Sequence, residues 1–209
     1  MHPQLNSLAE KLNPFVPFGA DKMVAQLIIS NNIHLTLTRQ RTTKIGDYRP
    51  PQKGKGHRIT INKNLNKFSF LITFIHELSH LTCWNDFQNK VLPHGTEWKN
   101  HFKRHMTPFL NNNFFPEIIL NALIKYMNNP AASSCADINL MKSLQMFEPD
   151  DGLKNLEELE ENSIFSLDGN KIFKKGALER KRYKCYNLTN KKYYLVSAIA
   201  RVKKIEKTD

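Results

Sequence analysis

The feature that most constrains the fold is an apolar stretch over residues 67–83, KFSFLITFIHELSHLTC. It is too long for a strand and too short to span a bilayer, so it predicts a buried helix. Three ionisable residues, His76, Glu77 and His80, lie inside this stretch. Because such groups are unfavourable in an apolar environment without partners, the helix must bring them to a ligand or to hydrogen-bond partners.

The spacing of the two histidines favours a metal ion. His76 and His80 lie one helical turn apart on one face, so both imidazoles can reach a single ion at about 2.0–2.1 Å. Glu77 stands beside them in the HExxH arrangement, in which the carboxylate accepts a proton from water activated by the metal. The alternative is a pair of hydrogen-bonded core histidines, and the motif in its apolar context favours the metal.

A catalytic zinc site also needs a third protein ligand and one open position. The metzincin pattern would place Gly at position 83 and His at position 86, but the chain has Cys83 and Asp86, which excludes that class. Two candidates follow the helix. Glu97 would give a thermolysin-like site, whereas His94 is better placed because Gly95 permits a sharp turn that directs the imidazole back to the first pair.

The remaining candidates near this site have other interpretations. His101 and His105 continue at four-residue steps from Glu97, and we interpret them as a polar helix stripe that faces phosphate or solvent. Cys83 as a fourth ligand would close the site, and core packing competes with that role. An oxyanion-stabilising residue is expected in the loop GDYRPP, where Tyr48 and Arg49 are candidates.

The run HELSHLTCWNDFQNKVLPHGTEWK over residues 76–99 resembles the signature of the SprT-like zinc metallopeptidases, the family that includes the eukaryotic protease Spartan. The resemblance covers roughly residues 20–127. It implies that His76, His80 and His94 bind one zinc ion per chain and that Glu77 is the catalytic base. The loop RTTKIGDYRPP and the terminal β-region are similar to SprT-like proteins of Bacteroidetes-type bacteria. The CxxC pairs of the zinc ribbon that ends many bacterial members are missing, so a second structural zinc is not expected.

Hydrophobic periodicity and composition predict an α+β fold with two domains. Alternation predicts strands at 33–39 and 57–62, joined by a polar loop, and helical spacing predicts further helices at 4–12, 20–30, 96–106 and 116–127. We expect a zincin-like metalloprotease core, with helices and a small antiparallel sheet, at residues 1–147. Residues 148–162 hold seven acidic residues and one lysine, which is typical of a solvated linker. The short alternating runs at 163–209 predict a small, basic, all-β domain.

The charge distribution favours a nucleic-acid partner. The formal net charge is +12, and residues 171–209 contain thirteen Lys or Arg against three acidic residues. Basic residues interleaved with aromatic ones suit single-stranded DNA or DNA–protein complexes, since charges pair with phosphates and rings stack on bases. The candidates are Arg180, Lys181, Arg182, Tyr183 and Lys184. Composition alone fits a solubilising charged face equally well. The resemblance to Spartan-type proteases is what favours nucleic acid.

The rest of the composition bears on location. Neither a signal peptide nor a membrane-spanning run is present, so no membrane partner is expected. Cys83, Cys135 and Cys185 form no CxxC pair, which favours a reducing compartment, the bacterial cytosol or nucleoid. Nothing in the sequence sets an oligomeric state.

The predicted function is a zinc-dependent metallopeptidase with a protein substrate. Because Spartan-type proteases act on proteins attached to DNA, the resemblance implies substrates associated with or crosslinked to DNA. The alternative is a zinc-bearing, nucleic-acid-binding scaffold whose protease activity is latent or vestigial. The presence of Glu77 argues against this alternative, since a purely structural site gains nothing from a base.

Overall fold

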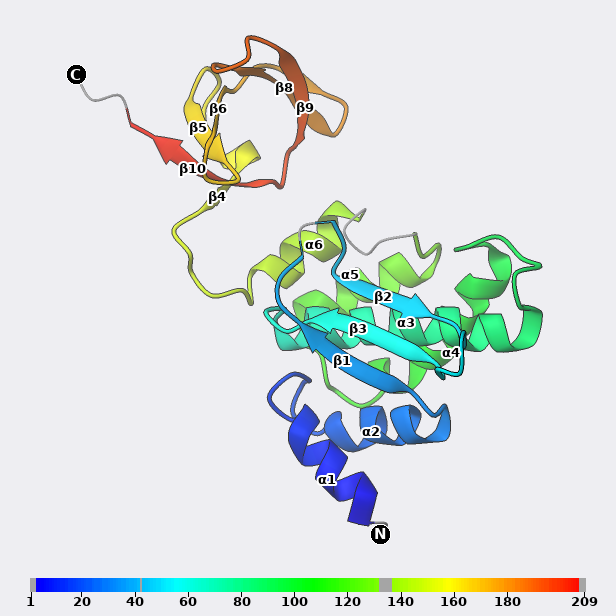
Figure 1. Cartoon of the computed structure of the whole chain (residues 1–209). Helices are drawn as coiled ribbons and strands as arrows, with labels where there is room; N and C mark the ends of the chain where they lie inside the picture. Colours follow the sequence, from blue (N-terminus) through cyan, green and yellow to red (C-terminus); the bar gives the residue numbers. More distant parts are fainter. Residues whose placement is uncertain (1–2, 42, 132–136, 207–209) are drawn as a thin grey trace. The chain divides into compact units, whose positions relative to one another are not determined.

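The computed structural model describes residues 3–41, 43–131 and 137–206. The chain divides into two compact units, Met1–Glu148 and Pro149–Asp209 (Figure 1). Each unit has a hydrophobic core of its own. Mixed helices and sheets place the chain in the α+β class. Cys83 and Cys185 are buried free thiols, and Cys135 lies outside the described residues.

The first unit consists of helices and a three-stranded sheet. Its described elements are α1 (Pro3–Leu12), α2 (Asp21–Ser30), β1 (His34–Thr38), β2 (Gly46–Arg49), β3 (Arg58–Asn62), α3 (Lys67–Phe87), α4 (Thr96–Leu110), α5 (Glu117–Met127) and α6 (Ile138–Gln145). The sheet lies across α3, and α4 packs along α3 from another side (Figure 1). In the described part of the chain, no helix combines the length and the hydrophobicity needed to cross a membrane.

Helix α3 is the centre of this unit. It begins at Asn66, whose side chain accepts hydrogen bonds from the backbone N–H groups of Phe68 and Ser69 and so caps the helix. Twelve of its residues are buried, because sheet and helices cover it on several faces. It ends at Phe87, where Gln88 takes a positive φ of 56°. Most side chains in the middle of α3 are therefore buried, whereas His76 and His80 are half-buried.

The sheet is mixed, so the expectation of an antiparallel sheet in this unit was wrong. Strands β1 and β3 pair in parallel, and β2 pairs with β3 in the antiparallel sense on the other side. The connection over residues 39–57 is long enough for the crossing that a parallel pair requires. It also contains β2, which the sequence analysis treated as loop because GDYR does not alternate in hydrophobicity.

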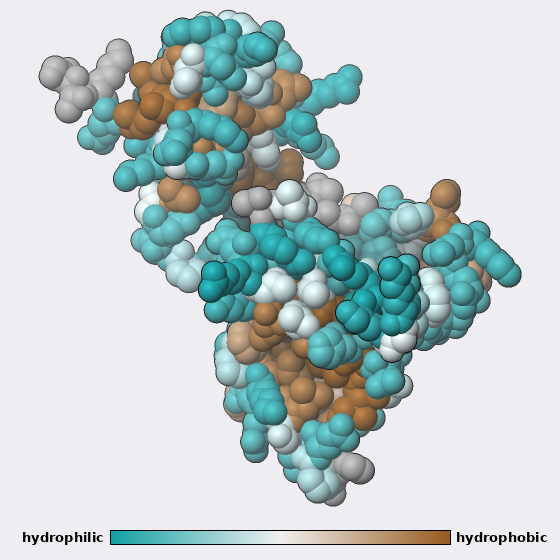
Figure 2. All heavy atoms as spheres, in the orientation of Figure 1, coloured by the Kyte–Doolittle hydropathy of each residue, from teal (hydrophilic) through white to brown (hydrophobic). Residues whose placement is uncertain are grey.

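An apolar area lies on the visible face of the first unit, over β1 and the neighbouring α2, with hydrophilic side chains around it (Figure 2). Leu27 of α2 and Leu35 and Leu37 of β1 are partly buried hydrophobic residues packed against the core. The inward-facing Ile59 and Ile61 of β3, beside them in the sheet, are completely buried. The register pairs Leu35 with Ile59 and Leu37 with Ile61, so these four side chains lie on one face of the sheet and belong to one core cluster.

The second unit is a small curled sheet. Its described elements are β4 (Lys154–Asn155), the 3-10 helix η2 (Leu156–Glu158), β5 (Ile164–Leu167), β6 (Lys171–Lys174), β7 (Leu178–Glu179), β8 (Arg182–Asn187), β9 (Tyr193–Ser197) and β10 (Arg201–Ile205). All pairings are antiparallel, and the strand order is β4-β10-β5-β6-β8-β7 with β9 on the other side of β8. The result agrees with an all-β C-terminal region.

Part of the stretch assigned to a linker belongs to this sheet unit. Leu156 and Leu159 lie in its core, although acidic residues surround them in the sequence. The buried Lys175 donates hydrogen bonds to the backbone carbonyls of Glu157 and Leu159, and so holds the acidic segment against β6. The acidic composition concealed two core leucines, and the second unit begins earlier than the sequence indicated.

Candidate metal centre

Three imidazoles meet between α3 and the segment that precedes α4. The Nε2 atom of His76 lies 3.1 Å from that of His80 and 3.2 Å from that of His94. A ring nitrogen carries either one proton or one lone pair, so His76 Nε2 can form a hydrogen bond with only one of these two neighbours. A cation between the three nitrogens satisfies all of them at once.

The donor set fits a zinc ion. The three ligand atoms all lie within 4.8 Å of one another, and in the described part of the chain this is the one such group of His, Cys, Asp or Glu. In a tetrahedral site with Zn–N bonds of about 2.0–2.1 Å, neighbouring nitrogens lie roughly 3.3–3.4 Å apart, close to the observed separations. Three protein ligands leave one position open, as a catalytic zinc site requires.

The protonation of the cluster also suits a metal. Burial lowers the pKa of His76 to about 3, with smaller contributions from His80 and His94. Burial likewise lowers the pKa of His80 to about 4, and it lowers the pKa of His94. The three rings are therefore neutral at pH 7, which is the form that coordinates a metal ion.

His94 reaches the pair through its own backbone conformation. It has a φ of 60°, in the left-handed region, whereas Gly95 has an extended conformation with φ of −70° and is the N-cap of α4. The expectation that Gly95 makes the sharp turn was wrong, because His94 has the positive φ. Gly95 instead allows the backbone to pack closely against Leu92, because a Cβ at this position would lie 3.0 Å from the carbonyl oxygen of Leu92. The strained backbone of His94 is of the kind found at ligand-binding sites.

The ring of Trp98 packs against all three imidazoles. The sequence alone did not identify Trp98 as part of the site. Its ring centroid lies 4.6 Å from that of His76, 5.4 Å from that of His80 and 4.7 Å from that of His94. The residue is completely buried, and its Nε1 has no hydrogen-bond partner among the described residues. The indole thus fixes the first turn of α4 against the histidines. The signal in the sequence was its position one turn after His94.

Glu77 lies in the same cleft as the three histidines, against the edge strand β2. The backbone N–H of Tyr48 donates a hydrogen bond to its carboxylate, which favours the charged form. Burial, assisted by the negative charge of Asp47, has the larger effect and raises the pKa of Glu77 to about 8. Close contact with β2 depends on Gly46, because a Cβ at that position would lie 2.5 Å from Oε1 of Glu77.

The three histidines and Glu77 line one cleft of about 420 Å³. One wall is the chain from Thr43 to Tyr48, which includes most of β2, and the other consists of α3 and His94. Strand β2 pairs with β3 on one side only, so in the described part of the chain its other edge is unpaired. The cleft therefore combines a candidate metal site, a buried carboxyl group and a free strand edge.

Of the two candidates for stabilising an oxyanion, Tyr48 lies at the cleft and Arg49 does not line it. The Tyr48 hydroxyl lies 3.0 Å from Nδ1 of His57, and burial raises the pKa of the phenol. Arg49 has an exposed side chain that forms an ion pair of 2.9 Å with Asp47.

The later histidines of α4 do not form a solvent-facing stripe, and that expectation was wrong. His101 is buried: its Nδ1 accepts a hydrogen bond from Arg104, and its Nε2 lies 3.3 Å from Asp86. Because a guanidinium only donates, Nδ1 of the neutral ring is the acceptor, and Nε2 carries the proton on the side that faces Asp86. His105 contacts Thr82 of α3 at 3.0 Å. Both residues join α3 to α4.

The structure also places the basic candidates of the second unit. Arg180 and Lys181 lie in the turn between β7 and β8, and Arg182 and Lys184 are exposed on β8. Tyr183 alternates to the inner face of β8. There the ammonium of Lys175 lies 4.0 Å from its ring centroid. The ring of Tyr183 is thus already in contact with the protein's own cation.

Comparison with known proteins gives one result for the first unit. The model of the SprT-like family matches residues 6–117, a segment that contains Glu77 and all three histidines of the candidate metal centre. No curated protein matches the chain, and no solved structure matches it.

Proposed function

Because the chain belongs to the SprT-like family, which is linked to metallopeptidase-like proteins, we propose that it is a zinc-dependent metalloendopeptidase with a zincin-like core. Its proposed substrates are proteins associated with or crosslinked to DNA. The observation that carries the proposal is the convergence of three imidazole nitrogens in the cleft that also contains Glu77.

Each residue of the cleft has a proposed task. Nε2 of His76, His80 and His94 would hold one zinc ion, which supplies Lewis-acid chemistry that polarises a peptide carbonyl and activates water near neutral pH. The positive charge of a bound zinc ion would favour the ionised form of Glu77. In that form Glu77 can accept the proton of the attacking water and then donate it to the leaving amine. The backbone N–H of Tyr48 holds the Glu77 carboxylate in place.

Two further features support peptide hydrolysis. The hydroxyl of Tyr48 can donate a hydrogen bond to the oxygen that gains negative charge during attack, once it turns from His57. The unpaired edge of β2 can pair with an extended peptide chain, whose backbone groups then supply affinity without restricting the side chains. An extended segment bound in this way would pass beside Glu77 and the histidines.

The DNA-related part of the proposal rests on the second unit. The excess of positive charge in residues 171–209 favours polyanions, and a protease held near DNA would meet DNA-bound proteins. We therefore propose that the protein acts in the bacterial cytosol or at the nucleoid.

The test uses the purified full chain loaded with one equivalent of zinc and an unstructured basic protein as substrate. We expect cleavage that stops when a chelator removes zinc, returns when zinc is added back, and increases in the presence of single-stranded DNA. Full cleavage after verified removal of the metal would rule out the proposed peptidase. Cleavage that DNA leaves unchanged would rule out its DNA-associated role.

A further inference from the structure

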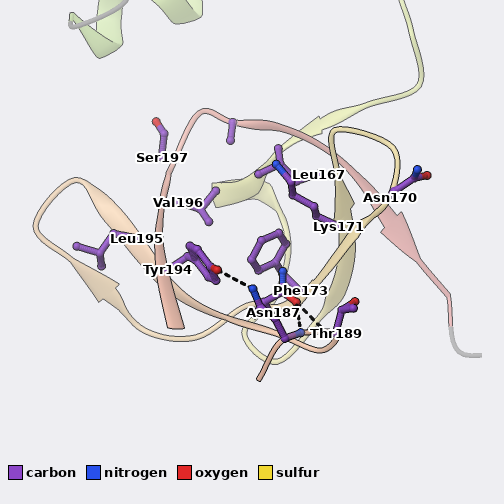
Figure 3. A pocket seen from close by; sticks show the side chains of 12 residues that line it. Leu167, Asn170, Lys171, Phe173, Asn187, Thr189, Tyr194, Leu195, Val196 and Ser197 are labelled. Carbon is purple, nitrogen blue, oxygen red and sulfur yellow. Dashed lines mark hydrogen bonds between the residues drawn. The ribbon is translucent and has the colours of Figure 1, made fainter. Parts of the chain in front are cut away.

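The curled sheet of the second unit contains a cavity of about 630 Å³ that the proposed peptidase does not use. It lies between β9, the β5–β6 hairpin and the turn after β8 (Figure 3). Its apolar wall includes Leu167, Phe173, Val196 and Ala200. A cavity of this size and lining is typical of a site for a small ligand or for one group of a larger ligand.

Two aromatic rings define the inside of this cavity. Tyr194 and Phe173 both point into it in Figure 3, with ring centroids 5.8 Å apart and planes at 85°. The side-chain amide of Asn190 donates a hydrogen bond of 2.6 Å to the Tyr194 hydroxyl, which holds that ring in position. Tyr194 is still 42% exposed, so part of its ring is available for stacking.

Neighbouring residues on β9 point to opposite faces of the sheet, so Tyr193 can be the control for substitutions of Tyr194. Tyr194 pairs with the buried Cys185 of β8, whereas Tyr193 pairs with Tyr186, whose ring it approaches on the outer face at 5.0 Å. Tyr193 is 65% exposed and does not line the cavity. Only one of the two tyrosines can contact a ligand inside.

The one charged side chain among the described residues that line the cavity is positive. Lys171 of β6 reaches towards the cavity in Figure 3, and its partner Asp168 is exposed at 3.5 Å, so that ion pair is weak. Thirteen Lys or Arg against three acidic residues follow in the segment 171–209. An occupant should therefore combine a flat ring with negative charge. An apolar peptide would gain nothing from this charge.

We propose that this cavity is a nucleotide-binding site that takes one base of a single-stranded nucleic acid. The base lies against Tyr194, and the adjoining phosphate lies near Lys171. The inference rests on the nucleic-acid part of the proposed function and deepens it. It assigns recognition of a base to the inside of the sheet, and it leaves contacts with phosphates alone to the basic turn at Arg180. A paired base cannot enter, so the site selects single strands over duplex.

The first experiment measures binding of the full chain to a fluorescein-labelled oligothymidylate of about ten nucleotides, a length that one small β-domain can cover. Fluorescence anisotropy at low salt should show saturable binding, and a duplex of equal length should bind more weakly. Tyr194→Ala should lower the affinity about 5- to 150-fold through loss of stacking. The control Tyr193→Ala should change it by less than about twofold.

The second experiment examines charge with a matched pair on β6. Lys171 and Lys174 lie in the same strand, but only Lys171 lines the cavity. Lys171→Gln should reduce the slope of log affinity against log salt by about one. Lys174→Gln should leave the slope closer to the wild-type value.

Two measurements keep the proposal testable if Tyr194→Ala fails to fold. Tyr194→Phe keeps the ring and removes only the hydroxyl, so it should retain most of the affinity. In the wild-type chain, an oligonucleotide containing 4-thiothymidine should crosslink to the peptides that carry Phe173 or Tyr194.

Absence of saturable binding, equal binding of duplex, or losses of affinity confined to Tyr193→Ala would overturn the proposal. Binding is measured without peptide cleavage, so failure of the nucleotide site and failure of the peptidase are separate results.

Discussion

The Nε2 atom of His94 lies 3.2 Å from the Nε2 atom of His76, although the two residues are 18 positions apart in the chain. One belongs to a buried helix and the other to the irregular segment before α4. A metal ion at this point would join two separate parts of the first unit. Metal binding should therefore stabilise the fold as well as support chemistry.

The first prediction concerns the third ligand. His94→Ala should weaken zinc binding by more than about 100-fold, beyond the effect of losing an outer-shell partner, because only two protein ligands remain. Metal content by mass spectrometry after dialysis against a weak chelator measures this. Glu97→Ala is the control, since Glu97 lies in the first turn of α4 but outside the ligand group. Metal lost from Glu97→Ala and retained by His94→Ala would indicate a thermolysin-like site.

The second prediction concerns the base. Glu77→Gln keeps the shape of the side chain and can still accept the Tyr48 N–H, but it cannot accept a proton from water. Zinc should stay bound while kcat falls by about 100- to 10,000-fold. A variant that cleaves at the wild-type rate would show that the activity does not depend on Glu77.

The third prediction concerns the Tyr48 hydroxyl. Tyr48→Phe should lower kcat by up to about 100-fold with little change in KM, because the hydroxyl is needed only as charge develops on the substrate oxygen. Zinc content should not change. Arg49→Gln, next to it on β2 but outside the cleft lining, should behave like the wild type. A higher KM with unchanged kcat would assign Tyr48 to substrate binding instead.

The fourth prediction concerns pH and the contact between α3 and α4. Burial lowers the pKa of His105 from 6.5 to about 4, and the charges of Arg104 and His101 act in the same direction. As pH falls from about 6.5 towards 4, the unfolded chain binds a proton at this position before the folded chain does, so stability is lost in that window. His105→Gln should lose less stability between pH 7 and pH 5 in urea unfolding.

The control for this experiment replaces the exposed His34 of β1 by Gln, which removes one histidine away from the contact between His105 and Thr82. Parallel profiles for His105→Gln and the wild type would contradict the role given to His105. All proteins are compared under the same metal loading, so effects of the zinc ligands are shared.

The fifth prediction separates the basic turn from its neighbouring tyrosine. Charge reversal at Arg180, Lys181 and Arg182 should flatten the salt dependence of DNA binding by about one unit for each lost phosphate contact. Tyr183→Ala should instead lower the melting temperature, since the ring packs against the core and the Lys175 ammonium. A large loss of single-strand affinity in Tyr183→Ala, without loss of stability, would restore Tyr183 as a stacking residue.

Local patterns in the sequence predicted the features that depend on local spacing. The pairing of His76 with His80 follows from helical periodicity within α3, and the basic β-region follows from short alternating runs. The strand β2 could not be predicted, because its pairing comes from β3 rather than from its own pattern. His101 depends in the same way on the packing of α4 against α3. Leu156 was hidden by the acidic residues around it, since composition does not show which side chains point inwards.

The position of His94 outside any helix has a consequence for recognising related sites. Packing of Trp98 against the three imidazoles, rather than the length of the segment between Gln88 and Leu92, holds α4 in register with α3. Lengthening a flexible loop changes its closure free energy only slightly, by roughly 0.6 kcal/mol for each doubling. Insertions in this segment should thus be tolerated. A motif search should fix His76, His80, His94 and Trp98 and allow the spacer between them to vary.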